Sequence, residues 1–262
     1  MLMLLMLMLM LMLMECLTVS MHPDMTGLLR PVTVLRQSSP GPQQFALLYD
    51  AIGHSMATMH MKPEAMPDAT AHLRALVCAN GLRIFLRLVT DLMTGLKTMH
   101  DLGLAHNMIA PAHVYYTIGK PFTLGDYALT LAVDGRPQTV MKQAFHAALR
   151  RHWAPELQRL LAPSHPDQEF MHVHAIDFRK ADMYALGTTL IDLLHVFVML
   201  IKGKVLHGDA VYQYVGGLGR WPMQMLLLLG DAIIDDPAER VSIDDFVDRF
   251  EQIKAAWPDP PL

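Results

Sequence analysis

Histidines are the side chains in this 262-residue sequence whose type and spacing first suggest chemistry, and there are 14 of them. His165, His172 and His174 lie in one segment, and on a strand the rings at positions 172 and 174 would point to one face, where they could bind zinc. No cysteine or fixed fourth ligand accompanies them, because Cys16 and Cys78 lack metal-type spacing. A surface loop without metal is therefore expected here, and the two cysteines leave the redox compartment open.

The composition is that of a globular protein large enough to bury a substantial core as one large domain or two small ones. Twenty-one Lys and Arg against 25 Asp and Glu give a net charge of −4, and no basic run is present. This balance argues against a nucleic-acid or anionic-membrane surface, so no nucleic-acid partner is predicted.

The N-terminus is an apolar repeat, "MLMLLMLMLMLMLM". It could be the apolar core of a signal peptide, with Thr18 and Ser20 near a cleavage point. It lacks a positive region before it, and a helix needs about 20 residues to span a bilayer. Residues 1–20 are therefore interpreted as either a low-complexity segment or a signal peptide, and Met21 or Met25 could be the true start.

The elements that would position a site begin with two predicted strands, at residues 31–37 and 44–52, and a Pro-bearing linker at 61–70. From Ala71 the chain is predicted to be helical, with a long helix ending near Gly103. The apolar face of that helix is formed by Phe85, Leu88, Leu92 and Leu96.

A small hairpin is predicted from the apolar runs at 114–116 and 122–124. Residues 183–201 are almost continuously apolar, which fits either a membrane span or a helix buried at the centre of a helical domain. Asp192 and His195 lie inside the run and are costly in hydrocarbon, so the core helix is favoured and no transmembrane span is predicted.

The last predicted helix begins with a capping box. Ser242 is followed three residues later by Asp245. Its buried stripe is predicted to consist of Phe246, Phe250 and Ile253.

These segments occur in the order of a protein kinase C-lobe and resemble it over about 190 residues, 71 to 257. His106 matches the catalytic-loop histidine, and "DYA" at 126–128 resembles the DFG motif. Ala154–Pro155–Glu156 matches the APE motif. The remaining matches are His100 at the end of the preceding helix, Asp182 and Gly187 in the buried F helix, and Arg240, which in that family pairs with the APE glutamate.

Departures from the kinase pattern decide the functional prediction. The position of the general base is Met108, which can accept no proton, and the loop lysine position is Ala110. The position of the asparagine that holds the second Mg²⁺ is His113, although Mg²⁺ prefers oxygen ligands. Asp126 matches a Mg²⁺ ligand, with a structural carboxylate that caps the following turn as the favoured alternative.

The N-terminal half of the kinase pattern is mostly missing, because no Gly-rich loop, strand lysine or helix C glutamate precedes "FALLYDAI". "GGLG" at 216–219 is interpreted as a turn. The predicted fold is α+β and kinase-like, a mainly helical C-lobe with a vestigial, truncated β N-lobe. The chain is predicted to divide into the low-complexity segment or signal peptide at 1–20, an N-lobe remnant with the hinge at 21–70, and a C-lobe at 71–258.

A narrower resemblance is carried by "MHDLGLAH", "FRKADMYALGTTL" and a long insertion between Glu156 and Asp182, which look like the rhoptry kinase family of apicomplexan parasites. The resemblance implies a pseudokinase that binds a protein partner without a cofactor and is located in the secretory pathway, the rhoptry or the host cell. Without this resemblance, a cytoplasmic location is expected. The alternative is a divergent active kinase that uses ATP and Mg²⁺ on protein Ser/Thr; a decaying gene copy without activity is a third.

Overall fold

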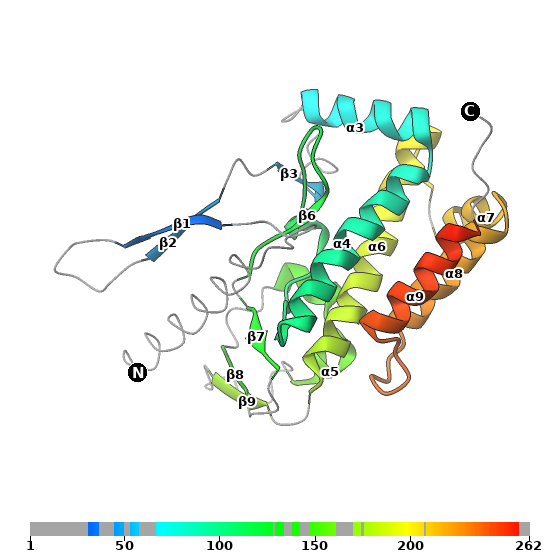
Figure 1. Ribbon diagram of the computed structural model, residues 1–262. Coiled ribbons are helices and arrows are strands. Elements are labelled where there is room, and N and C mark those ends of the chain that lie inside the picture. Colours follow the sequence, from blue (N-terminus) through cyan, green and yellow to red (C-terminus); the bar gives the residue numbers. More distant parts are fainter. Residues whose placement is uncertain are drawn as a thin grey trace.

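The computed structural model describes ten stretches of the chain. The two short N-terminal stretches each contain one strand, and the remainder is mainly helical (Figure 1). The predicted segment at 1–20 lies outside the described residues. The stretches are 31–36, 45–49, 53–57, 67–127, 129–133, 138–141, 147–160, 170–173, 176–206 and 208–256.

Helix α4, Arg83–Asp101, has the apolar face that the sequence predicts. Phe85 is 1% exposed, and Leu88, Leu92 and Leu96 are fully buried. The helix ends where Gly103 adopts φ 76°, a left-handed conformation that glycine reaches without steric cost. Helix α3, Pro67–Asn80, begins inside the predicted linker because Pro67 occupies the first turn, where its missing N–H costs nothing.

Helix α6, Phe178–Lys202, runs through the middle of the helical layer, beside α4 (Figure 1). It begins where the carboxylate of Asp177 accepts from the amides of Arg179 and Lys180, and it ends at Gly203 in the left-handed conformation. By length and composition, α6 could cross a membrane, but half of its most apolar window is buried inside the molecule. Its leucines and Phe197 join the main core, which is the packing predicted for a central core helix.

The C-terminal helices α7, Asp209–Gly216, α8, Arg220–Ala232, and α9, Ile243–Ala255, pack beside α6 and α4 (Figure 1). The predicted capping box is present, since the Ser242 hydroxyl accepts from the Asp245 amide at 3.1 Å. The buried stripe of α9 contains the predicted Phe246, Phe250 and Ile253.

Gly187 lets α6 approach the end of α8 closely. A Cβ at this position would lie 2.9 Å from the Cβ of Ala232 and 2.7 Å from Ile233. Such distances are far shorter than ordinary carbon–carbon contacts, so a side chain here would push the two segments apart. In the "GGLG" turn, Gly219 has φ 136°, a conformation that only glycine adopts readily.

The described strands form small antiparallel sheets. The predicted strand regions contain β1, Pro31–Arg36, and β2, Phe45–Tyr49, which pair with each other. The predicted hairpin is confirmed: β5, Val114–Tyr116, pairs with β6, Thr123–Leu124. The other strands are β3 His54–Ser55 paired with β5, β4 Leu104–Ala105 with β7 Leu131–Ala132, and β8 Gln138–Met141 with β9 Phe170–Val173.

Candidate functional site around the 105–113 loop

A buried carboxylate on α6 holds the loop that follows β4. The two oxygens of Asp182 accept from the backbone amides of His106 and Asn107, each at 2.7 Å. The ring of His100, at the end of α4, lies 3.0 Å from the same carboxylate. The Asp182 side chain is fully buried, so these contacts replace its hydration shell and fix the loop on the central helix.

Asn107 is a loop residue whose structural role was not predicted from the sequence. It adopts φ 63°, and its side-chain amide donates to the carbonyl of Leu129 at 3.0 Å. This bond ties the loop to the segment that follows Asp126. Asparagine tolerates positive φ better than most residues, and this was the only signal of its position in the sequence.

His106 is packed inside the loop as a neutral ring. Its Nδ1 accepts from the amide of Met108 at 3.2 Å, and its ring meets Tyr127 edge to face with centroids 5.5 Å apart. Burial lowers the pKa of His106 to about 4, despite the opposing attraction of Asp182. The ring therefore supports the loop and carries no charge at neutral pH.

Acid should destabilise the protein between about pH 6.5 and pH 4. Burial also lowers the pKa of His152 to about 4, so both histidines take up protons on unfolding within this window. Stability is then fully present above pH 6.5 and is lost as the pH falls, by roughly 3 kcal/mol per histidine at most. Urea unfolding at a series of pH values measures the loss, and His106→Gln should flatten the pH dependence. An unfolding free energy that is constant from pH 7 to pH 4 would contradict the prediction.

His113 and Asp126 form a pair that neither sequence alternative for Asp126 contained. The Nε2 of His113 lies 3.1 Å from a carboxylate oxygen of Asp126, and its Nδ1 lies 2.5 Å from the carbonyl of Met108. Both ring nitrogens of His113 thus face oxygen atoms. Asp126 adopts φ 64°, a left-handed conformation that aspartate adopts more readily than most residues.

The two other degenerate positions carry no acid or base. Ala110 is 1% exposed and packs within the loop. Met108 is partly buried, and its backbone makes polar contacts with His106 and His113. Within the described residues, no group of three His, Cys, Asp or Glu could hold a metal ion; His172 lies on β9, while His165 and His174 fall outside them.

Glu156 and Arg240 meet although 84 residues separate them in sequence, as predicted. The two terminal nitrogens of the guanidinium donate to the two carboxylate oxygens at 2.8 and 3.1 Å. The same guanidinium donates to three backbone carbonyls: Ile234 at 2.8 Å, Lys180 at 2.7 Å and Asp235 at 3.2 Å. The Arg240 side chain is completely buried, and this set satisfies all five of its N–H donors.

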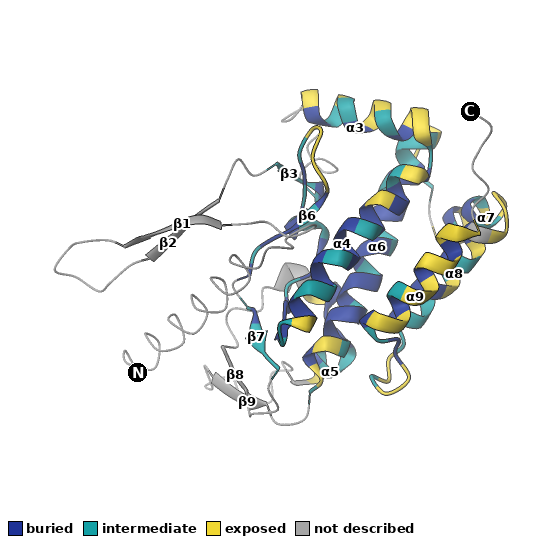
Figure 2. Cartoon of the chain, in the orientation of Figure 1, coloured by how far each residue is buried: buried dark blue, intermediate teal, exposed yellow. Residues whose placement is uncertain are grey.

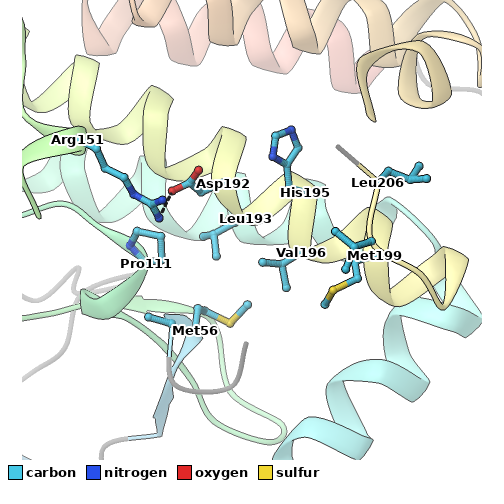
Figure 3. A pocket seen from close by; sticks show the side chains of 11 residues that line it. Met56, Pro111, Arg151, Asp192, Leu193, His195, Val196, Met199 and Leu206 are labelled. Atoms are coloured by element: carbon cyan, nitrogen blue, oxygen red, sulfur yellow. Dashed lines mark ion pairs between the residues drawn. The ribbon is translucent and has the colours of Figure 1, made fainter. Parts of the chain in front are cut away.

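A cavity of about 280 Å³ adjoins the loop where Pro111 faces α6 (Figure 3). At one end, Arg151 and Asp192 point toward one another at 2.6 Å, with the ring of His152 at 3.5 Å from the same carboxylate. The remaining lining includes Leu193, Val196 and Met199 of α6 together with Met56 and Leu206 from other segments. From the sequence, Asp192 was noted only as a charged residue that would be unfavourable in hydrocarbon. In the structure it forms an ion pair with Arg151.

Comparison with known proteins shows a partial similarity to a protein kinase. No protein-family profile matches the chain. Over 116 residues, 43% of its length, the chain is 26% identical to the interferon-induced, double-stranded RNA-activated protein kinase of Rattus norvegicus. The chain is similar to a protein kinase. The match spans 19% of that kinase, and the mainly helical architecture is compatible with a kinase-like C-lobe.

Proposed function

We propose that this chain is a catalytically impaired protein kinase-like protein, a pseudokinase, that acts as a protein-binding or allosteric module. The observation that carries the proposal is the pair between His113 and Asp126 beside Met108. Under the kinase resemblance, these three positions would supply the second metal ligand, the first metal ligand and the general base. Here the ligand positions bind each other, and the base position holds a thioether.

The residues present do not fit Mg²⁺. Mg²⁺ requires oxygen ligands in a near-octahedral set, whereas an imidazole nitrogen occupies the neighbourhood of the Asp126 carboxylate. Neither ATP nor Mg²⁺ is therefore proposed as a cofactor.

The proposal predicts no phosphate transfer above background. A positioned general base alone contributes roughly 10²–10⁴ in rate, and Met108 cannot supply one. Radiolabelled ATP with generic protein substrates, together with autophosphorylation, measures the activity of the full chain. Turnover that Asp126→Ala abolishes would overturn the proposal. Lys204→Glu, a change on an exposed loop, is the control for a loss of activity caused by substitution and purification alone.

The alternative is a divergent active kinase that transfers phosphate from ATP to protein Ser/Thr. The similarity to the rat kinase favours it, since that relative is named as a protein kinase. That name also includes activation by double-stranded RNA, but the net charge of −4 supports a protein partner rather than nucleic acid. The turnover assay separates the two functions.

The narrower proposal is a secreted effector of the rhoptry type. It is supported by "MHDLGLAH", by "FRKADMYALGTTL" and by the insertion between Glu156 and Asp182. Within this insertion, the structure describes residues 157–160, 170–173 and 176–181. Under this proposal the protein partner belongs to the host cell or the parasite. Without the rhoptry resemblance, a cytoplasmic location is proposed.

A further inference from the structure

The outer face of helix α8 presents large apolar side chains to solvent. The helix packs on α6, α7 and α9, and exposed positions alternate with buried ones along these C-terminal helices (Figure 2). Met223 is 47% exposed and Leu227 is 61% exposed. The two residues are four positions apart, so they lie next to each other on one face of the helix. Single exposed apolar residues are common, whereas neighbouring ones on one helix face are typical of a contact surface.

Gly230 belongs to the same face, three residues after Leu227. A Cβ at this position would meet no atom of the described chain within 4 Å, so close packing inside the molecule does not require a glycine. Its φ is not positive either, so the backbone conformation does not require one. Glycine is unfavourable inside a helix, and the open space beside it would let a second chain approach the backbone closely.

Opposite charges stand at the two ends of this face, at helical spacing from Met223 and Leu227. Arg220, the first residue of α8, is exposed, and its guanidinium forms no hydrogen bond or ion pair with a described residue. Asp231, near the end of α8, has a side chain that is 41% exposed and pairs with Arg249 of α9 at 2.5 Å. A carboxylate offers about four acceptor sites, so Asp231 can accept a second guanidinium.

Both charges are placed unfavourably for their own helix. A helix carries partial positive charge at its N-terminus and partial negative charge at its C-terminus, so Arg220 in the first turn and Asp231 in the last turn each oppose the helix dipole. A second α8 that packs antiparallel reverses this relation, because its C-terminus lies beside Arg220 and its N-terminus lies beside Asp231. The face is therefore complementary to itself in one orientation.

We propose that the chain forms a dimer in which the α8 helices of two copies pack antiparallel about a two-fold axis. Met223 of each copy then faces Leu227 of the other, and Arg220 of each copy crosses Gly230 of the other to reach Asp231. Every contact occurs twice, because both copies use the same patch. One helix of 13 residues from each copy gives a small interface, so a weak, reversible dimer is expected. The inference goes beyond the proposed function and uses no residue of the 105–113 loop.

Sedimentation velocity of the full chain over about a hundredfold range of concentration measures the association. We expect the sedimentation coefficient to rise with concentration toward that of a dimer. Leu227→Asp should weaken the association by about tenfold or more, because it places a carboxylate at the centre of the contact in both copies. Ile118→Asp is the matched control: this side chain is 50% exposed on the β5–β6 turn, and the change should leave the association unaltered. Circular dichroism checks that both variants fold.

A charge exchange tests the antiparallel orientation. Arg220→Asp brings two carboxylates together at each end of the contact, and Asp231→Arg brings two guanidinium groups together, so each variant should associate about fivefold more weakly. An equal mixture of the two variants should recover the association, because each end of the mixed dimer again combines one arginine with one aspartate. Both side chains are accessible to solvent, and an exposed ion pair such as Asp231 with Arg249 contributes little to the fold, so both variants should fold.

Gly230→Gln separates the helix from the dimer. Glutamine forms helices better than glycine, so the dilute, monomeric chain should melt at a higher temperature. The same change should weaken the association, because the new side chain fills the space that Arg220 of the other copy crosses. A residue with a purely structural role in its own helix would not give these two opposite results.

Three results would overturn the inference: a chain that stays monomeric at every concentration, association that Leu227→Asp leaves unchanged, or a mixture of the charge variants that associates no better than either variant alone. The second result would place the contact elsewhere, for instance at the apolar N-terminal repeat. Phosphate transfer is measured separately, so a monomeric chain leaves the pseudokinase proposal standing, and observed turnover leaves the dimer result standing.

Discussion

Replacing Arg240 by alanine should lower the free energy of unfolding by roughly 3–5 kcal/mol, because the change leaves the Glu156 carboxylate and three carbonyls without their donor in a buried place. That loss is a large share of the ~5–15 kcal/mol that stabilises a typical domain. A chain of this size should then melt about 10 °C earlier or more. Urea unfolding and thermal melts followed by circular dichroism measure both quantities.

The matched control is Arg249→Ala on α9. Arg249 pairs with Asp231 at 2.5 Å, but its side chain is 44% exposed and that of its partner 41%. Exposed pairs contribute about 0–1 kcal/mol, so this variant should melt almost as the unchanged protein does. If Arg240→Ala were as mild as Arg249→Ala, the buried anchor described above would not stabilise the fold.

Replacing Asp182 by alanine should cost a comparable amount, roughly 3–5 kcal/mol. The amides of His106 and Asn107 and the ring of His100 would all lose their acceptor in an interior that water does not reach. Asp182→Asn keeps the shape and one acceptor oxygen but places an amide N–H₂ against donors, so an intermediate loss is expected.

Hydrogen exchange gives this prediction a local readout. The amides of His106 and Asn107 should exchange faster in Asp182→Ala than expected from the global loss of stability, because their bonds to the carboxylate are gone. Asp101→Ala is the control, since that carboxylate is 60% exposed and pairs with Lys97 on the same helix. Equal protection of both amides in the two variants would contradict the role given to Asp182.

Periodic and local features of this fold could be predicted from the sequence. The buried face of α4 follows from apolar residues at helical spacing, and the start of α9 follows from Ser242 and Asp245, because both depend on neighbours along the chain. The contact of Glu156 with Arg240 is long-range, and it was predicted only through the order of kinase-like motifs.

Other features could not be predicted, because they depend on which distant segments come together. His113 was identified only as a poor metal ligand, and its pairing with Asp126 required the β5–β6 hairpin to bring the two residues to one place. The start of α3 at Pro67 was missed because proline both ends and begins helices.

The junction of Glu156 with Arg240 has a consequence for the rate at which the protein unfolds. Closing a contact across 84 residues requires most of the intervening chain to be in place, so the pair should form after the transition state for folding. An interaction that is absent from the transition state leaves the folding rate nearly unchanged and slows unfolding. The pairing of the APE-like Glu156 with Arg240 would then mainly slow unfolding, which extends the lifetime of the folded protein.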